Sequence, residues 1–436
     1  MKRVLSLLLV AVLLSACLPQ NVQVPQSPLL STLERKAGLI AYMGVDGNIF
    51  VSDQAGGKLK QLTDDAVIDQ NAAELSIYQL PTWAQDGNQL AFVNTRGNNA
   101  AATATIYVAD IAADTVTEVY TSDSEFPFYL YWSPDSANVS FLSTTRSGQS
   151  LLLQSVPVDG GEKTLIDTGS PYYWSWAPDG RTLISHSGGA ADSSTPEKLA
   201  FIQLQDADII ESVLEDAPAA FQAPAWSPDG SRIVLTRESG GKKEVILTDS
   251  SGAYEKTLGT FELNAAVGWS SDSTKVAYIE GTQNINVGTI GKLHVADLAN
   301  DKTITAGESV LAFFWSPNGK KLAYFVPVTL DSANNDSQSQ SGQAANRFLL
   351  QLNMLDIATG ETSTLFTYQP TDQFLSILPY FDQYNQSVTI WSPDNNNLVL
   401  SFVDADGTPG IAIAAASGQM EPRLLTNGYI AYWSWK

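Results

Sequence analysis

Short stretches of alternating apolar and polar residues recur along the chain from about residue 38 onward, and polar turns separate them. Segments such as Leu90–Phe92 and Val276–Tyr278 show the period of two that is typical of a half-buried strand. Each follows a tryptophan and a turn of the Ser-Pro-Asp-Gly type, in which proline fixes φ, aspartate bonds the backbone and glycine accepts a positive φ. Two further stretches complete each unit, so the pattern predicts units of four antiparallel strands.

Seven tryptophans mark these units, at intervals of 43 to 50 residues except for the last, which is 76. They are Trp83, Trp132, Trp176, Trp226, Trp269, Trp315 and Trp391. The turns that follow carry Asp86, Asp135, Asp179, Asp229, Asp272, Asn318 and Asp394. A residue found in seven equivalent places serves the repeat, so we expect structural roles for both sets, with the rings between blades. Repeated four-stranded units predict an all-β fold, the β-propeller.

The two ends of the repeat region look like halves of one further unit. A strand of the second type, GLIAYMG from Gly38, has no tryptophan turn before it, and NIFVSDQAGGK and KLKQLTDD follow as third and fourth strands. The C-terminal YIAYWSWK reads as an inner strand with no unit after it. We therefore predict an eight-bladed propeller over residues 36–436, closed by pairing of the C-terminal strand with the N-terminal blade. Either Trp433 or Trp435 is then the repeat tryptophan.

The repeat resembles that of TolB-type β-propellers, which are WD-repeat-like. The resemblance lies in the W-S-P-D-G turn, the following strand of the type KKLAYFV and the later LLT, and it extends from about Gly38 to Lys436. It implies a propeller with protein partners in the cell envelope. TolB-like proteins usually carry an α/β domain before a six-bladed ring, and this sequence shows neither, so the transport-system role is not carried over.

The N-terminal segment resembles the signal peptide of a bacterial lipoprotein. Lys2 and Arg3 precede an apolar run, Val4–Leu14, that is too short for a transmembrane helix. Leu-Ser-Ala-Cys then ends at Cys17, the sole cysteine, in the manner of a lipobox. We predict a signal peptide over 1–16 and a lipidated Cys17 on a flexible tether over 17–35, which leaves no cysteine for a disulfide. The alternative is an ordinary cleaved signal peptide with a chance cysteine.

The charge balance limits the partners. The chain has 436 residues, 44% of them hydrophobic and 16% charged, with a net charge of −22. Loss of residues 1–16 leaves 22 basic against 46 acidic residues, or −24. Such a surface repels nucleic acid and anionic lipid, so we expect membrane attachment through the lipid anchor, on the extracytoplasmic side of the cell envelope. A monomer is expected, with an envelope protein, peptide or glycan as its partner.

Two inserts fall in the 76-residue interval. In a propeller of four-stranded blades, both lie on the same face. The first, Pro327–Asn346, is of low complexity, and the second, Thr367–Ser387, is rich in aromatic residues and is expected to fold over something. Aromatic and acidic residues before the inner strands predict a binding face there. Its candidates are Tyr78, Phe128, Tyr129, Tyr172, Phe221, Glu262, Phe381, Tyr384 and Tyr429. The alternative for each ring is packing between blades.

Signals for catalysis are few. The two histidines, His186 and His294, belong to different units without a neighbouring histidine or cysteine, and no G-x-S-x-G occurs. We expect no metal and no cofactor, and we predict a binding or interaction scaffold and not an enzyme. The alternative is a carbohydrate- or peptide-processing enzyme that uses carboxylates at the propeller mouth. Loop carboxylates available for such a pair are Asp123, Glu125, Glu262, Asp372 and Asp382.

Overall fold

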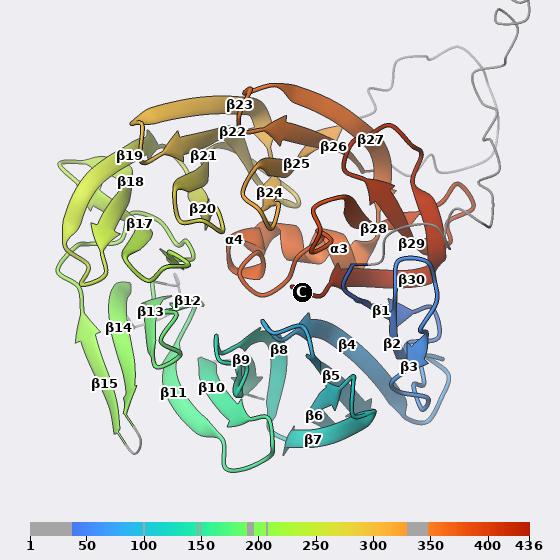
Figure 1. Ribbon diagram of the computed structural model, residues 1–436. Coiled ribbons are helices and arrows are strands. Elements are labelled where there is room, and N and C mark those ends of the chain that lie inside the picture. The colour runs from blue at the N-terminus through green and yellow to red at the C-terminus, as the bar shows by residue number, and fades with distance from the viewer. Residues whose placement is uncertain are drawn as a thin grey trace, which may run out of the picture. The chain divides into compact units, whose positions relative to one another are not determined.

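The computed structural model describes residues 37–98, 101–145, 148, 150–189, 196–205, 208–328 and 348–436. Residues 36–436 form one compact unit, in which β-sheets stand around a common centre (Figure 1). This arrangement is a β-propeller of four-stranded antiparallel blades, as the repeat predicts. No helix in the described part of the chain has the length and hydropathy that crossing a membrane requires. The predicted signal peptide and tether, residues 1–35, lie outside the described residues.

Five sheets contain four strands each, hydrogen-bonded in chain order from the centre outward. The first is β4 (Leu75–Trp83), β5 (Gln89–Gly97), β6 (Ala102–Asp110) and β7 (Thr115–Ser122), and the second is β8 (Glu125–Trp132), β9 (Asn138–Thr145), β10 (Leu151–Pro157) and β11 (Thr164–Gly169). The third is β12 (Tyr172–Trp176), β13 (Thr182–Ser187), β14 (Lys198–Gln205) and β15 (Asp208–Val213). The fourth is β16 (Ala225–Trp226), β17 (Arg232–Ser239), β18 (Lys242–Asp249) and β19 (Tyr254–Phe261), and the fifth is β20 (Ala265–Trp269), β21 (Lys275–Ile285), β22 (Gly288–Asp297) and β23 (Lys302–Val310).

The remaining ten strands form one continuous sheet. Its order is β24 (Ala312–Trp315), β25 (Lys321–Val328), β26 (Leu349–Asp356), β27 (Thr362–Pro370), β28 (Asn397–Val403), β29 (Pro409–Ala415), β30 (Arg423–Trp433), β1 (Ile40–Gly44), β2 (Ile49–Ser52) and β3 (Lys60–Gln61). Strand β30 pairs with β29 through its first half and with β1 through its second half. The predicted pairing of the C-terminal strand with the N-terminal strand is therefore present.

The junction of β30 with β1 reproduces the local geometry of an uninterrupted repeat. In the second sheet, Trp132 pairs with Val139, and Asn138 N–H donates to the Ser133 hydroxyl over 3.0 Å. At the junction, Trp433 pairs with Ile40, and Leu39 N–H donates to the Ser434 hydroxyl over 2.9 Å. Two segments almost four hundred residues apart thus make the bonds that one turn makes elsewhere.

The hydrogen bonds of the indole nitrogens distinguish Trp433 from Trp435 as the tryptophan of the C-terminal strand that follows the repeat pattern. Four of them donate to the backbone oxygen of the residue that precedes the tryptophan of the previous inner strand: Trp132 to Thr82, Trp269 to Ala225, Trp315 to Gly268 and Trp391 to Phe314. Trp83 donates to Tyr432 in the same way, over 3.2 Å. Because Tyr432 precedes Trp433, the repeat tryptophan of this strand is Trp433 and not Trp435. Trp433 is fully buried.

The Pro-Asp turns are held by their own side chains. Ser133 donates to the Asp135 carboxylate over 2.6 Å, and Ala137 N–H donates to the same oxygen over 3.0 Å. Equivalent serine-to-aspartate bonds occur at Asp229, Asp272 and Asp394. These contacts agree with the structural role predicted for the repeated turn residues.

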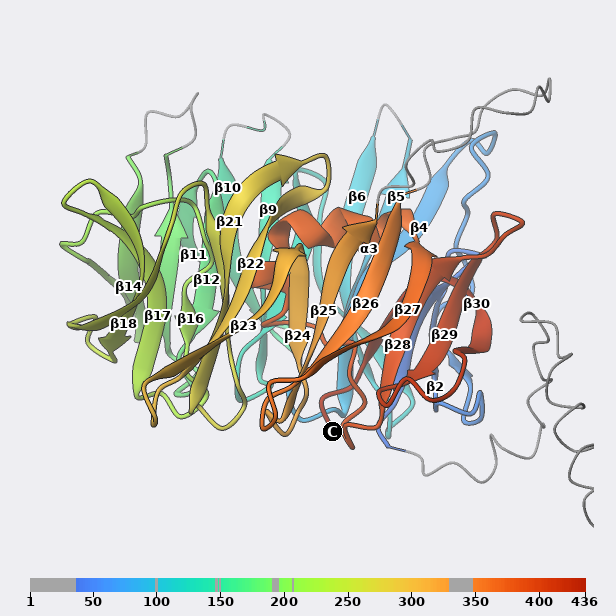
Figure 2. The same cartoon turned by 90° about the horizontal axis from the view of Figure 1, so that it is seen from above.

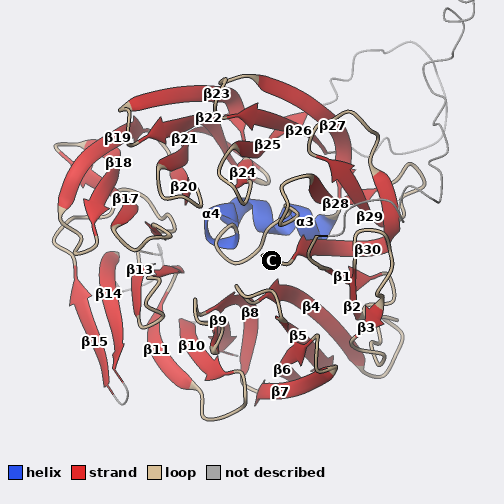
Figure 3. Ribbon diagram, in the orientation of Figure 1, coloured by secondary structure: helices blue, strands red, loops and turns tan. Residues whose placement is uncertain are grey.

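The aromatic-rich insert folds into short helices at the centre of the sheets (Figure 3). Helix α3 (Asp372–Ile377) begins with Thr371 as its cap, and the 3-10 turn η1 (Leu378–Tyr380) leads into α4 (Phe381–Tyr384). Phe374, Ile377 and Phe381 are buried in the core that also holds the inner strands. Figure 2 shows α3 on the side of the β21–β22 hairpin, away from the C-terminus. The insert therefore folds over the inner strands, which the prediction had left unnamed.

Candidate functional site

Gln383 of α4 fastens the insert to two blades. Its amide oxygen accepts a hydrogen bond from Trp174 N–H over 2.9 Å, and its amide nitrogen donates to the Trp174 carbonyl over 2.9 Å. The Tyr129 hydroxyl donates to the backbone oxygen of Gln383 over 3.0 Å. All three residues are buried, so water does not compete for these bonds. The insert is consequently part of the folded core and not a loose loop.

Asp382 places a carboxyl group in the interior beside Gln383. One oxygen accepts from Ala223 N–H over 2.8 Å and the other from Gln383 N–H over 3.1 Å. The residue is only 6% exposed. Burial raises the pKa of Asp382 to about 6, against the lowering effects of the backbone N–H groups and of the nearby His186. A buried carboxyl with this pKa is a common feature of functional sites.

The buried carboxyl gives a testable dependence of stability on pH. The folded pKa of Asp382, about 6, lies above the ordinary aspartate value of 3.8, so the folded state binds more protons between these values and stability rises as pH falls. Asp382→Asn removes this titration. We expect the unfolding free energy of the wild type, relative to Asp382→Asn, to rise by about 2–3 kcal/mol between pH 7 and pH 4. Urea unfolding of both proteins measures it, and a difference that is independent of pH would contradict it. His186 and Tyr173, which interact electrostatically with Asp382, are present in the wild type and in Asp382→Asn alike.

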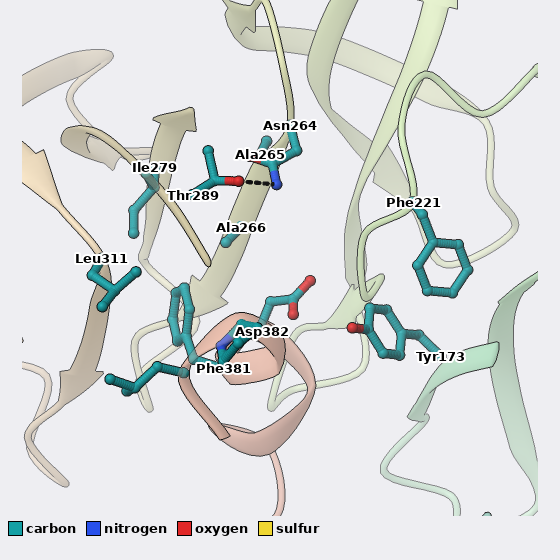
Figure 4. Close-up of a pocket in the computed structure, with 12 residues that line it drawn as sticks. Tyr173, Phe221, Asn264, Ala265, Ala266, Ile279, Thr289, Leu311, Phe381 and Asp382 are labelled. Carbon is teal, nitrogen blue, oxygen red and sulfur yellow. Dashed lines mark hydrogen bonds between the residues drawn. The ribbon is translucent and has the colours of Figure 1, made fainter. Parts of the chain in front are cut away.

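Asp382 lines a small polar cavity between the insert and several blades (Figure 4). The cavity has a volume of ≈ 50 Å³. Its walls are Tyr173, Phe221, Asn264, Ala265, Ala266, Ile279, Thr289, Leu311, Leu378, Pro379, Phe381 and Asp382. The rings of Tyr173 and Phe221 lie 4.4 Å apart between centroids, and Asn264 donates to the Thr289 hydroxyl over 2.8 Å. The cavity thus combines aromatic surface with one carboxyl group.

Behind the Phe221 ring, His186 joins β13 to the segment before β16. One ring nitrogen lies 2.9 Å from the Gln222 carbonyl and the other 2.8 Å from the Glu197 carboxylate. The second histidine, His294, lies 3.2 Å from Glu280 in another blade. The described residues contain no cluster of three His, Cys, Asp or Glu side chains that could hold a metal ion. Both histidines therefore have structural partners.

A second cavity, of ≈ 200 Å³, lies on the other side of the insert and is mainly apolar. Its walls are Met43, Ile77, Gln79, Leu80, Pro81, Thr82, Leu130, Gln373, Ser376, Ile377, Tyr384, Val388, Ile430 and Tyr432. Leu80 adopts a positive φ of 60° at an irregularity of the β4–β5 pairing. Because leucine rarely adopts this conformation, the inner strand is strained where it borders the cavity.

The residues predicted for the binding face divide by burial. Tyr78, Tyr129, Tyr172 and Phe381 are buried, Phe221, Tyr384 and Tyr429 are half-buried, and Phe128 and Glu262 are exposed. The hydroxyls of Tyr78 and Tyr172 donate to Asp65 and Asp167 over 2.5 and 3.0 Å. The rings of Tyr78 and Tyr172 therefore pack in the interior of the propeller, in line with the alternative interpretation of these residues. The structure brings Phe221 and Phe381 together at the polar cavity and Tyr384 to the apolar one, whereas Cys17 lies outside the described residues.

The structure adds residues that sequence reasoning did not select for the site. Asn264 and Thr289 line the polar cavity together with Tyr173, and Gln383 holds the insert in place. The sequence carried one usable signal, the aromatic-rich insert immediately before an inner strand. Nothing in the sequence distinguishes Asn264 or Thr289 from the many other polar loop residues.

The loop carboxylates do not assemble into a pair at either cavity. Burial raises the pKa of Glu125, but hydrogen bonds from Lys163, Gln154 and Tyr120 outweigh it and hold the pKa below its usual value. Glu262, Asp123 and Asp372 are exposed. Asp382 is the one carboxyl residue among the walls of the two cavities.

Comparison with known proteins adds the family. The model of the TolB beta propeller domain matches residues 27–271. TolB from Acinetobacter baumannii is 12% identical, with 85% of this chain and 87% of that chain covered and a TM-score of 0.38. An oligogalacturonate lyase from Vibrio parahaemolyticus is 14% identical, with 87% and 98% covered and a TM-score of 0.47. The β-propeller domain of the trilobed protease from Pyrococcus furiosus is 13% identical, with 81% and 96% covered and a TM-score of 0.47. No curated protein matches the sequence.

Proposed function

The chain belongs to the TolB beta propeller domain family, and from this premise we propose that it is a membrane-anchored binding protein of the cell envelope. It holds an envelope protein, a peptide or a glycan at the loop-rich face of the propeller, and it works as a monomer without a cofactor. The net charge of −22 disfavours nucleic acid as a partner.

One observation supports binding over carboxylate catalysis. The two cavities beside the insert are lined by a single carboxyl residue, Asp382. Glycoside hydrolysis by the usual mechanisms needs two carboxyl groups about 5–9.5 Å apart across the bond that is cleaved. A site with aromatic walls, an apolar cavity and one carboxyl group is suited to hold a ligand and lacks the second group for this chemistry.

The alternative, a carbohydrate- or peptide-processing enzyme, has one observation in its favour. The pKa of Asp382 is raised to about 6, which is close to the value that suits a general acid or base. Incubation with soluble envelope glycans and peptides tests this alternative. Turnover that is lost in Asp382→Asn would favour the enzyme, and its absence favours binding.

The proposal includes an eight-bladed ring in which the ten-stranded sheet counts as three blades. The pairing of β30 with β1 supports this count, as does the bond from the Trp83 indole to Tyr432, because both repeat the contacts between other consecutive blades. In this reading β30 is the fourth strand of one blade and the inner strand of the next.

The anchor can be tested by removing the thiol that it requires. If Cys17 is acylated, Cys17→Ala should move most of the protein from the membrane fraction to the soluble fraction, since no other acyl chain remains. Fractionation followed by immunoblotting measures this. Cys17→Ser is a second variant with the same expected result, and membrane retention of both would contradict the anchor.

The binding role is tested by crosslinking on two faces. A photoreactive residue replaces the exposed Glu262, in the loop that leads into β20, or the exposed Asp179, in a Pro-Asp turn at the opposite end of an inner strand. In intact cells we expect a discrete crosslinked partner from position 262 and none from position 179. Equal crosslinking from both positions, or none from 262 and from a further probe at Phe128, would contradict binding at the loop-rich face.

A further inference from the structure

We propose that the polar cavity around Asp382 binds a primary ammonium group, supplied by a lysine side chain of the partner. The proposal rests on the binding role proposed above and names the chemistry that this face recognises. Its elements are the charge of the carboxyl group, the aromatic walls and the size of the cavity.

Asp382 supplies a negative charge that no cation of the cavity wall balances. Its two oxygens each accept one backbone N–H, from Ala223 and Gln383. The walls contain neither lysine nor arginine. The nearby imidazole of His186 is engaged with Gln222 and Glu197. A buried carboxylate without a cationic partner is costly, and a ligand that carries a positive charge into the cavity would offset this cost.

The aromatic walls favour an organic cation over a metal ion. Tyr173, Phe221 and Phe381 line the cavity, and Figure 4 shows the Asp382 carboxylate in the space between the ring of Phe381 and that of Tyr173. An ammonium group is attracted both by a carboxylate and by the face of an aromatic ring. Hard metal ions instead take about six to eight oxygen ligands, and this wall offers one carboxyl group.

The volume and the rim set the kind of ammonium group. A cavity of ≈ 50 Å³ has room for about three to five waters, since each needs about 10–15 Å³ on this measure. An ammonium group with one or two methylenes fits this space, whereas the planar guanidinium of arginine is larger. The rim includes the exposed Pro379 and the half-buried Tyr173 and Phe221, so a long side chain can enter from solvent.

The test uses the full chain and two probes that differ in charge, Nα-acetyl-lysine methylamide and the uncharged Nα-acetyl-norleucine methylamide, whose side chain is one atom shorter. Saturation-transfer NMR and titration at pH 7.5 measure binding. We expect the lysine probe to bind the wild type and the norleucine probe to bind at least tenfold more weakly. Asp382→Asn should reduce lysine binding at least tenfold. Glu308→Gln, which removes an exposed carboxylate of β23 outside the cavity wall, should leave it unchanged.

Three outcomes would overturn the inference: equal binding of both probes, equal lysine binding by the wild type and Asp382→Asn, or tighter binding of the corresponding arginine probe. If Asp382→Asn does not fold, Phe221→Ala takes its place, because it removes a half-buried ring and leaves the charge. We expect it to weaken lysine binding several-fold, and unchanged binding would overturn the inference.

The probe experiment and the crosslinking experiment fail independently. Crosslinking from position 262 without lysine-probe binding would keep the binding role and reject the ammonium site. Lysine-probe binding without a crosslinked partner would keep the ammonium site and reject the envelope-binding role. A crosslinked partner whose yield falls in Asp382→Asn and in the presence of the lysine probe supports both.

Discussion

Trp433→Ala should lower the unfolding free energy by about 3–5 kcal/mol, the range for truncating a fully buried tryptophan. Trp433 is fully buried and pairs with Ile40 of β1. Its backbone N–H also donates to the Thr389 carbonyl over 3.0 Å. The substitution therefore removes packing at the point where the two ends of the propeller meet. Urea unfolding followed by circular dichroism measures the loss.

The neighbouring Trp435 is the matched control. It is the same residue type, two positions away, and it is only half-buried. We expect Trp435→Ala to cost less than half as much as Trp433→Ala. Equal losses would contradict the assignment of Trp433 as the repeat tryptophan. Deletion of residues 429–436 should cost more than either substitution, because strand pairing with β1 is lost as well.

Gln383→Ala should detach the insert from the blades and cost roughly 2–4 kcal/mol. The side chain satisfies both backbone groups of Trp174, and each buried polar group left without a partner costs about 1–3 kcal/mol. The effect should be local as well as global. Hydrogen exchange of residues 371–387 should accelerate, while exchange in strands remote from the centre, such as β18, stays slow.

Gln373→Ala is the control for this substitution. Gln373 belongs to the same insert, on α3, but is only half-buried. We expect little change in stability and in hydrogen exchange. If Gln373→Ala and Gln383→Ala behave alike, the anchoring role of Gln383 is wrong. If neither alters exchange within 371–387, packing of Phe374 and Phe381 alone holds the insert.

Much of the fold could be predicted from the sequence because the same pattern of strands and turns occurs seven times. The turn after each tryptophan needs proline, aspartate and glycine for local backbone reasons, so its sequence signal does not depend on the rest of the molecule. The N- and C-terminal halves of one unit were recognisable because their strands match those of the complete units, although neither half carries the turn, and β1 and β30 pair as those halves predict. The helices of the insert were not predicted, since short helices in a polar, aromatic segment have no periodic signal.

The candidate site was only partly readable. Aromatic residues before inner strands were recognised as a group, but sequence pattern does not separate a ring that packs inward from one that borders a cavity. Tyr172 and Tyr173 are adjacent, yet Tyr172 is buried against Asp167 and Tyr173 lines the polar cavity. Adjacent residues of a strand point to opposite faces, and which face meets a cavity depends on the neighbouring blade.

The sequence by itself determined the repeat, the strand order within each unit and the structural role of the turn residues, because these follow from local backbone preferences and periodicity. Only the tertiary structure decided that Trp433 and not Trp435 completes the series, because that depends on the indole of Trp83 reaching Tyr432 across the junction. It also decided that Asp382, one of several loop carboxylates, is the buried one. Its environment is built by Ala223, Tyr173 and Phe221, which lie far away in sequence and meet only at the centre of the propeller.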